Sequence, residues 1–193
     1  MEDKRIKKTK KNLKATLIAM LNQMSFEQIT ITELCRQSDT SRITFYKHYN
    51  DKYALADEIF QDYLKAGMEI YERRQQQNNH RNDIVTGYCN MLDSIFEVYY
   101  GNYDFFRHTN PEENPHLAFS FYKLVLDTVE MHTDRIRRNL KLRYTPKQIA
   151  GFLCYGILGF INESHKEKVP RDEILRGARE ILVRVLRSES VIR

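Results

Sequence analysis

The sequence predicts an all-α protein of about nine helices, in which an N-terminal three-helix head is joined by a long helix to a helical-bundle body. Glycine and proline are scarce, with 7 and 4 among 193 residues, and apolar residues recur every three or four positions along most of the chain. No segment alternates apolar and polar residues as a half-buried strand would. Because 41% of the residues are hydrophobic, a chain of this length can bury an ordinary core.

The head begins with a predicted helix over about residues 4–24, in which the apolar side chains have helical spacing. The segment SFEQIT interrupts this helix, and Thr30 then opens a second one. Thr30 and Glu33 have the spacing of a capping box, in which each side chain accepts a hydrogen bond from the backbone N–H of the other residue.

The second helix ends in the short turn SDTS. Asp39 lies where the chain must reverse, and aspartate tolerates the left-handed conformation better than most residues other than glycine. Ser41 caps a third helix over about 42–48. Asn50 or Asp51 caps a long fourth helix, which we expect to end near residue 75.

The rest of the chain is also predicted to be helical. The polar stretch RRQQQNNHRN (73–82) is expected to be a loop, and Pro146 and Pro170 stand where helix starts place proline. The further helices are expected over about residues 82–100, 102–108, 114–140, 146–166 and 171–188.

The excess positive charge is concentrated near the N-terminus. Residues 1–52 hold 11 Lys+Arg and 6 Asp+Glu, whereas residues 53–193 hold 20 of each, so the whole formal excess of +5 lies in the first quarter of the chain. A small basic module joined to a neutral body indicates a polyanion partner for the module. The alternative is that the early lysines only keep a helix solvated.

Catalysis and metal binding are not expected. The chain has no Gly-rich phosphate loop, no HExxH motif and no Cys or His pair at metal-ligand spacing, so we predict no enzyme activity, no cofactor and no metal. The three scattered cysteines, Cys35, Cys89 and Cys154, are typical of reduced thiols in a cytoplasmic protein. Neither a membrane span nor a signal peptide is expected, because the apolar runs are too short.

Residues 30–48 have the spacing of a helix-turn-helix unit, whose second helix lies in the DNA major groove with its first residues nearest the base edges. Arginine is suited to this position because its fork matches guanine O6 and N7. The residues expected nearest the base edges are Ser41, Arg42 and Thr44. The side chains expected to reach the phosphate backbone are Tyr46, His48, Tyr49 and Lys52.

The segment ITITELCRQSDTSRITFYKHYNDKYAL (29–55) resembles the DNA-binding signature of TetR-family transcriptional regulators. The matching features are Thr30, the Thr44-Phe45-Tyr46 core, Tyr49, the Asp51-Lys52 pair and Leu55, and the resemblance is specific over about residues 10–60. The chain departs from the pattern at Asp39, where the family usually has a turn glycine, and at Cys35, where it usually has a smaller residue.

The resemblance implies a helix-turn-helix DNA-binding domain over residues 1–52 and a helical ligand-binding and dimerisation domain over 53–193. It implies a homodimeric regulator, which we expect to be a repressor, that binds a palindromic operator in double-stranded DNA. Release by a small apolar or aromatic ligand in the body is expected. The implied DNA contacts are Thr30, Thr32, Ser41, Arg42, Thr44, Tyr46, Lys47, His48, Tyr49 and Lys52.

Some alternatives remain open. Tyr49 can belong mainly to the core with a wetted hydroxyl, and His48 can be an ordinary surface histidine. A TetR-like coactivator that acts through protein contacts would also have this fold. The basic and hydroxyl side chains retained between residues 42 and 52 favour DNA binding over that alternative.

The body is rich in aromatic residues, most of which are expected to be core because they have helical spacing. Where hydroxyl groups converge with apolar walls, a ligand pocket is the second interpretation, with His132 as one possible polar anchor. The candidate pocket residues are Tyr88, Met91, Phe96, Tyr99, Phe105, Phe106 and Tyr122.

The last two predicted helices resemble the dimer-forming pair of the family, because small residues let another helix approach closely. The segment CYGILGFI also resembles a Gram-positive subgroup that includes dihydroxyacetone kinase operon regulators, although this chain lacks the subgroup's usual tryptophan. The candidate dimer residues are Gly151, Tyr155, Gly156, Gly159, Phe160, Ile174, Ala178, Ile181, Leu182 and Val185.

Overall fold

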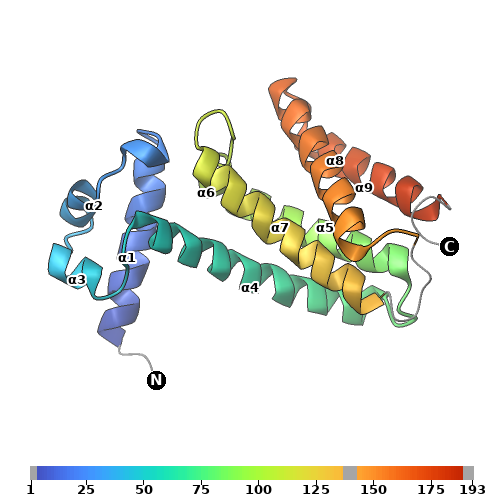
Figure 1. The fold of residues 1–193 in the computed structure, drawn as a ribbon, viewed down its shortest axis with the longest axis horizontal. Helices are drawn as coiled ribbons and strands as arrows, with labels where there is room; N and C mark the ends of the chain where they lie inside the picture. Colours follow the sequence, from blue (N-terminus) through green and yellow to red (C-terminus); the bar gives the residue numbers. More distant parts are fainter. Residues whose placement is uncertain (1–3, 137–142, 189–193) are drawn as a thin grey trace. The chain divides into compact units, whose positions relative to one another are not determined.

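The computed structural model of the protein describes residues 4–136 and 143–188. Within these ranges the chain forms nine α-helices and one short 3-10 helix, and it contains no strand, which confirms the predicted all-α fold (Figure 1). The α-helices are α1 (Lys4–Leu21), α2 (Ile31–Gln37), α3 (Arg42–Tyr46), α4 (Lys52–Asn78), α5 (Ile84–Gly101), α6 (Tyr103–Phe106), α7 (Pro115–Ile136), α8 (Pro146–Lys166) and α9 (Arg171–Arg187).

The largest difference from the expected boundaries is at the end of α4. The prediction of a loop from residue 73 is wrong, because the helix continues through the Arg and Gln residues to Asn78. These side chains are good helix formers, so their polarity marks an exposed face and not a break. The helix ends where the Asn79 side chain binds the backbone N–H of Asp83 at 2.7 Å.

Two of the head helices are shorter than predicted, since α1 ends at Leu21 and α3 at Tyr46. The expected end of the seventh helix at residue 140 lies outside the described residues.

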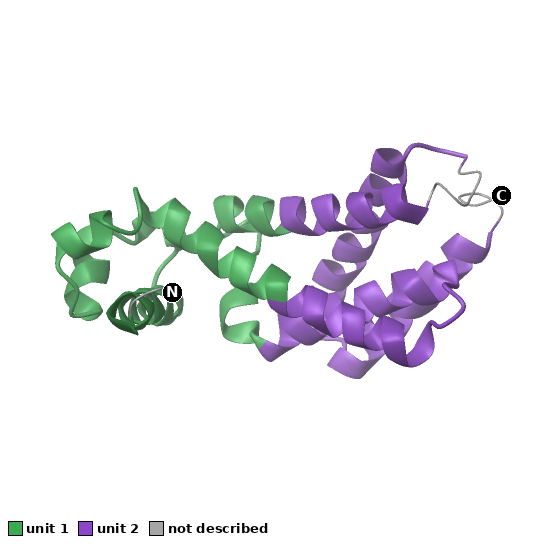
Figure 2. Ribbon diagram, turned by 90° about the horizontal axis from the view of Figure 1, so that it is seen from below, with its two compact units in different colours: residues 1–65, 102–121 green, residues 66–101, 122–193 purple. Residues whose placement is uncertain are grey.

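The chain divides into two compact units (Figure 2). Unit 1 comprises residues 1–65 and 102–121, and unit 2 comprises residues 66–101 and 122–193, so α4 and α7 each contribute to both. The division of the chain into functional domains at residues 52/53 stays a prediction.

The core of unit 1 has two parts. The first part lies within the head, where apolar side chains of α1, the 3-10 helix (Phe26–Gln28), α2 and α3 are fully buried together with Leu55. The second part is an aromatic cluster in which the Phe60 ring lies 5.1 Å from Phe105 between centroids. The other members of this cluster are Tyr63, Phe106 and Phe121.

Unit 2 is built on α9, which packs against both α5 and α8. The buried stripe of α9 is Ile174, Ala178, Leu182 and Leu186. Gly177 allows the α8–α9 contact, because a Cβ atom there would lie 2.9 Å from the Phe160 ring. No helix in the described ranges combines the length and apolar character that crossing a membrane requires.

Candidate nucleic-acid interface

The helix-turn-helix geometry depends on two capped helices and a left-handed turn residue. Thr30 Oγ1 accepts a hydrogen bond from Glu33 N at 3.2 Å, and Ser41 Oγ accepts one from Thr44 N at 3.1 Å. Between them, Asp39 has a φ of 49°, which confirms the left-handed conformation predicted from the sequence. The turn is closed by the hydrogen bond from Thr40 N to Cys35 O at 2.9 Å.

One detail of the predicted cap is wrong. The Glu33 carboxylate does not return to the backbone of Thr30 but accepts hydrogen bonds from Arg36 and Gln37. These bonds lower the pKa of Glu33 to about 2. The capping box is therefore only half formed, because the arginine one turn later competes for the same carboxylate.

Most of α3 is exposed on the face opposite Phe45, which is fully buried. Arg42, Ile43, Tyr46 and Lys47 are all exposed. The Arg42 guanidinium lies 6.0 Å from the centroid of the Tyr46 ring, at the outer limit of a cation–π contact. This face therefore presents one guanidinium, one ammonium, one phenol and one apolar side chain.

Some of the remaining polar side chains of the helix-turn-helix already contact other residues of the head, and others are exposed to solvent. Ser41 is exposed, but its hydroxyl lies 2.9 Å from the hydroxyl of half-buried Thr44 in addition to capping α3. Thr30 and Thr32 are both exposed at the start of α2, and His48 is half-buried beside the ring of Tyr49.

Tyr49 belongs to the core in this structure. Its side chain is 4% exposed, and its ring lies 5.7 Å from that of Phe45 between centroids. The Lys10 ammonium lies 5.7 Å from the same ring centroid. The structure therefore places the Tyr49 ring in the core, as the alternative to a DNA contact predicted, but the hydroxyl is buried as well and not exposed to water.

Lys52 also turns inward. Its ammonium donates hydrogen bonds to the carbonyl oxygens of Phe26, Glu27 and Ile29 at 2.8, 2.9 and 3.0 Å. All three protons of the ammonium are thus engaged by the end of the α1–α2 connection. Burial lowers the pKa of Lys52. In this geometry the ammonium supports the backbone of the head and is not presented to a phosphate.

The same connection is held from a second direction by the beginning of α7. The buried backbone N–H of Phe26 donates to Asn114 Oδ1 at 2.6 Å. The Phe26 ring stacks on His116 at 5.7 Å with an interplanar angle of 11°. We call the contacts of Lys52, Asn114 and His116 with Phe26 the Phe26 clamp. No local sequence pattern indicates this clamp, because its members lie far apart along the chain.

Some lysines of α1 form ion pairs within the protein, and others are exposed to solvent. Lys10 and Lys14 form ion pairs with Glu58 at 3.2 and 2.8 Å, so part of the positive charge is neutralised within unit 1. Lys4, Lys7, Lys8 and Lys11 are exposed. The charge that remains available to a polyanion therefore lies mainly in the first turns of α1 and along α3.

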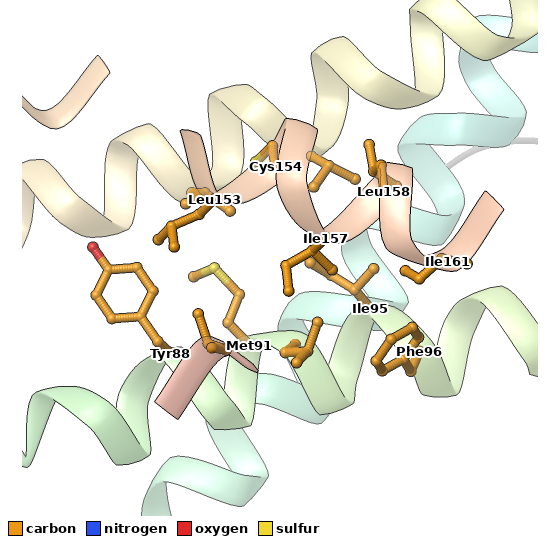
Figure 3. Close-up of a pocket in the computed structure, with 13 residues that line it drawn as sticks. Tyr88, Met91, Ile95, Phe96, Leu153, Cys154, Ile157, Leu158 and Ile161 are labelled. Carbon is orange, nitrogen blue, oxygen red and sulfur yellow. The ribbon is translucent and has the colours of Figure 1, made fainter. Parts of the chain in front are cut away.

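Unit 2 contains a small apolar cavity of about 50 Å³ between α5 and α8 (Figure 3). Three of the seven predicted pocket residues, Tyr88, Met91 and Phe96, line it from α5. Cys154 lines the cavity from α8, and burial raises the pKa of its thiol to about 12. A cavity of this size is far below the roughly 300–1,000 Å³ of typical ligand sites.

The other predicted pocket residues lie elsewhere. Phe105 and Phe106 belong to the aromatic cluster of unit 1. Tyr99 stacks on His165, and the Tyr122 ring contacts that of Tyr155 at a tilt, with ring centroids 4.4 Å apart. Helical spacing indicated that these aromatic residues would find packing partners, but it could not indicate which ones.

A buried polar network lies beside the cavity wall. Gln75 Oε1 accepts from Asn79 and Asn90, so its amide nitrogen donates to the Tyr71 hydroxyl. The Tyr71 hydroxyl lies 3.2 Å from His132 Nδ1, and it donates to this nitrogen in the tautomer that carries the imidazole proton on Nε2. Among the described residues Nε2 has no hydrogen-bond partner, and burial and the charge of Arg135 lower the pKa of His132 to about 4.

The predicted dimer residues separate into two groups. Ile174, Ala178 and Leu182 are buried inside the protomer. By contrast, Tyr155 is 67% and Ile181 41% exposed, and nothing lies within 4 Å of a Cβ atom built on Gly151, Gly156 or Gly159. Phe160 and Val185 are half-buried, and Phe160 already contacts α9.

Neither a protein-family model nor a curated protein matches this chain. Solved structures do. A candidate TetR-family transcriptional regulator from Syntrophomonas wolfei is 12% identical, with a TM-score of 0.73 over 91% of this chain and 93% of the other. The fatty acid degradation regulator FadR from Bacillus halodurans is 10% identical, with a TM-score of 0.60 over 93% and 96%. A TetR-family transcriptional regulator from Chloroflexus aurantiacus is 12% identical, with a TM-score of 0.52 over 97% and 94%. The chain therefore has the fold of TetR-family transcriptional regulators.

Proposed function

We propose that the protein is a TetR-family transcriptional regulator that binds a specific DNA sequence through the exposed face of α3. The observation that carries the proposal is this face, on which Arg42 and Lys47 project from the second helix of a capped helix-turn-helix. The location of the entire net positive charge in residues 1–52 supports the same conclusion. The chain shares its fold with transcriptional regulators, and this supports a binding protein over an enzyme.

The proposed set of DNA contacts contains fewer residues than the set that the sequence predicted. Arg42 and Thr44 contact base edges, and Thr30, Thr32, Tyr46, Lys47 and His48 contact the backbone. Ser41 acts mainly as the cap of α3. Tyr49 and Lys52 support the head from within and are not included among the DNA contacts.

The proposed active form is a homodimer that reads a palindromic operator. α8 exposes Phe152 at 62% and Tyr155 at 67% and carries three glycines with open space beside them, so it is suited to close helix packing against a second copy. Ile181 is an exposed apolar side chain on α9 that could also contribute to the contact with a second copy. Two-fold symmetry would set the recognition helices roughly 34–36 Å apart, or a multiple of that distance.

The proposed regulation is repression that a small apolar or aromatic ligand relieves. The cavity beside Tyr88 and Met91 is the place where such a ligand would bind, but at about 50 Å³ it must open to admit one. The ligand and the operator would then favour different conformations, with a reciprocal coupling of about 1–3 kcal/mol. The direction of control and the Gram-positive subgroup rest on the sequence resemblance alone.

The test is a pull-down of sheared genomic DNA from the source organism with the full chain in about 150 mM salt, a concentration at which non-specific binding is weak. We expect one palindrome to be enriched and the enrichment to be lost with Arg42→Ala, which removes about 1–3 kcal/mol and relaxes the preference at one base pair. Uniform, salt-sensitive binding in both proteins would contradict the proposal and favour a coactivator that acts through protein contacts.

A further inference from the structure

Ile43 is the most exposed large apolar side chain in the described ranges, with 74% of its surface accessible. It is the second residue of α3, between Arg42 and Thr44, and so lies among the side chains that a helix-turn-helix presents to base edges. The side chain that α3 contributes to the core of the head is Phe45, which is fully buried, whereas Ile43 lies outside this core. Contact with an apolar partner would remove this side chain from water.

We propose that Ile43 is a specificity-determining residue that contacts the C5-methyl group of a thymine in the major groove. The inference rests on the proposed DNA-binding function and adds one base to those that Arg42 and Thr44 read. Thymine is the only one of the four bases that presents a methyl group in this groove. An apolar side chain that packs on this group distinguishes a thymine from a cytosine, which presents a hydrogen-bond donor at the adjacent position.

The surroundings of Ile43 favour DNA over an apolar protein surface. Arg42 and Lys47 are exposed on the same short helix, and Tyr46 is 48% exposed. A protein partner that covered Ile43 would have to desolvate these cationic groups as well, which is costly without opposite charges. The major groove places an apolar methyl group and anionic phosphates within reach of one helix, and it therefore matches both properties of this face.

The test begins with selection of the preferred site from random-sequence duplexes by the full chain. Each thymine of that site is then replaced by deoxyuridine, which retains base pairing but lacks the methyl group. We expect one position in each half-site at which the replacement weakens binding about fourfold, the change that about 0.8 kcal/mol per buried methyl group produces. Binding by Ile43→Ala is expected to be insensitive at that position, whereas Ile43→Val keeps the sensitivity.

Two controls separate this contact from general effects. Lys47→Ala should bind all duplexes more weakly but keep the full fourfold response to deoxyuridine. Because Ile43 is exposed, Ile43→Ala should unfold at the same urea concentration as the wild type. If the wild type selects a site in which no thymine methyl group couples to Ile43, the inference is wrong and the proposed function stands. If no site is enriched at all, both are wrong.

Discussion

α3 and the first turn of α4 carry similar side chains within the segment that resembles a DNA-binding signature, but these side chains point in opposite directions. Arg42 at the start of α3 and Lys47 at its C-cap are exposed to solvent. In α4, the Lys52 ammonium is fully engaged by three backbone carbonyl groups, and Tyr49, just before this helix, is buried. Residue type and position in this segment therefore do not separate an exposed side chain from one that supports the fold. The direction of the side chain does, and the two groups should respond differently to substitution.

The largest expected effect concerns His132, an inward polar group whose pKa is lowered to about 4. An unfolded histidine has a pKa of about 6.5, so the unfolded state binds a proton first as the pH falls. Above pH 6.5 His132 is neutral in both states and does not change the free energy of unfolding. Between pH 6.5 and pH 4 the free energy of unfolding falls progressively by an amount on the order of 3 kcal/mol. Urea unfolding at pH 7, 5.5 and 4 measures this loss.

The matched variant is His132→Asn, because the asparagine oxygen can still accept from Tyr71 where Nδ1 did. We expect it to reduce the pH dependence of unfolding, whereas the exposed His80→Asn should leave the dependence as in the wild type. Equal pH dependence in all three proteins would contradict the assignment of this loss to His132.

The next effect concerns Lys52. Lys52→Met keeps the aliphatic stem but leaves the carbonyl groups of Phe26, Glu27 and Ile29 without their charged donor. We expect the free energy of unfolding to fall by about 2–3 kcal/mol, since hydrogen bonds to charged groups contribute about 1.5–3 kcal/mol. Lys47→Met is the control and should change stability by less than about 0.5 kcal/mol. Unchanged stability together with a weaker salt dependence of DNA binding would show that Lys52 contacts phosphate after all.

The smallest expected effect concerns Lys47, one of the two basic side chains that are exposed to solvent. Lys47→Met should weaken binding to all DNA sequences alike and reduce the slope of log affinity against log salt by about 1, the loss of one phosphate contact. Lys65→Met, an exposed lysine on α4, should leave the slope unchanged. A change in base preference with Lys47→Met would instead place this side chain at a base edge.

The features that the sequence predicted well depend on local interactions. The left-handed Asp39, the cap at Ser41 and the helix starts at Pro146 and Pro170 follow from backbone sterics and from hydrogen bonds within a few residues. The helical pattern of apolar residues also predicted the number of helices.

The features that the sequence could not predict depend on partners far along the chain. Lys52 binds carbonyl groups 23 to 26 residues away, and a backbone acceptor has no sequence signal. Phe105 and Phe106 have the composition of a ligand pocket but pack on Phe60 and Tyr63. Ile43 was missed because an apolar residue in an amphipathic segment is normally assigned to the core.

The Phe26 clamp has a consequence for recombination between proteins of this fold. The backbone N–H of Phe26 finds its acceptor on Asn114, 88 residues further along the chain. A chimera that transplants only residues 1–52 would sever this bond and the stacking on His116, leaving a buried donor unsatisfied at a cost of about 1–3 kcal/mol. The unit that can be exchanged intact is discontinuous, and it includes the start of α7 together with the head.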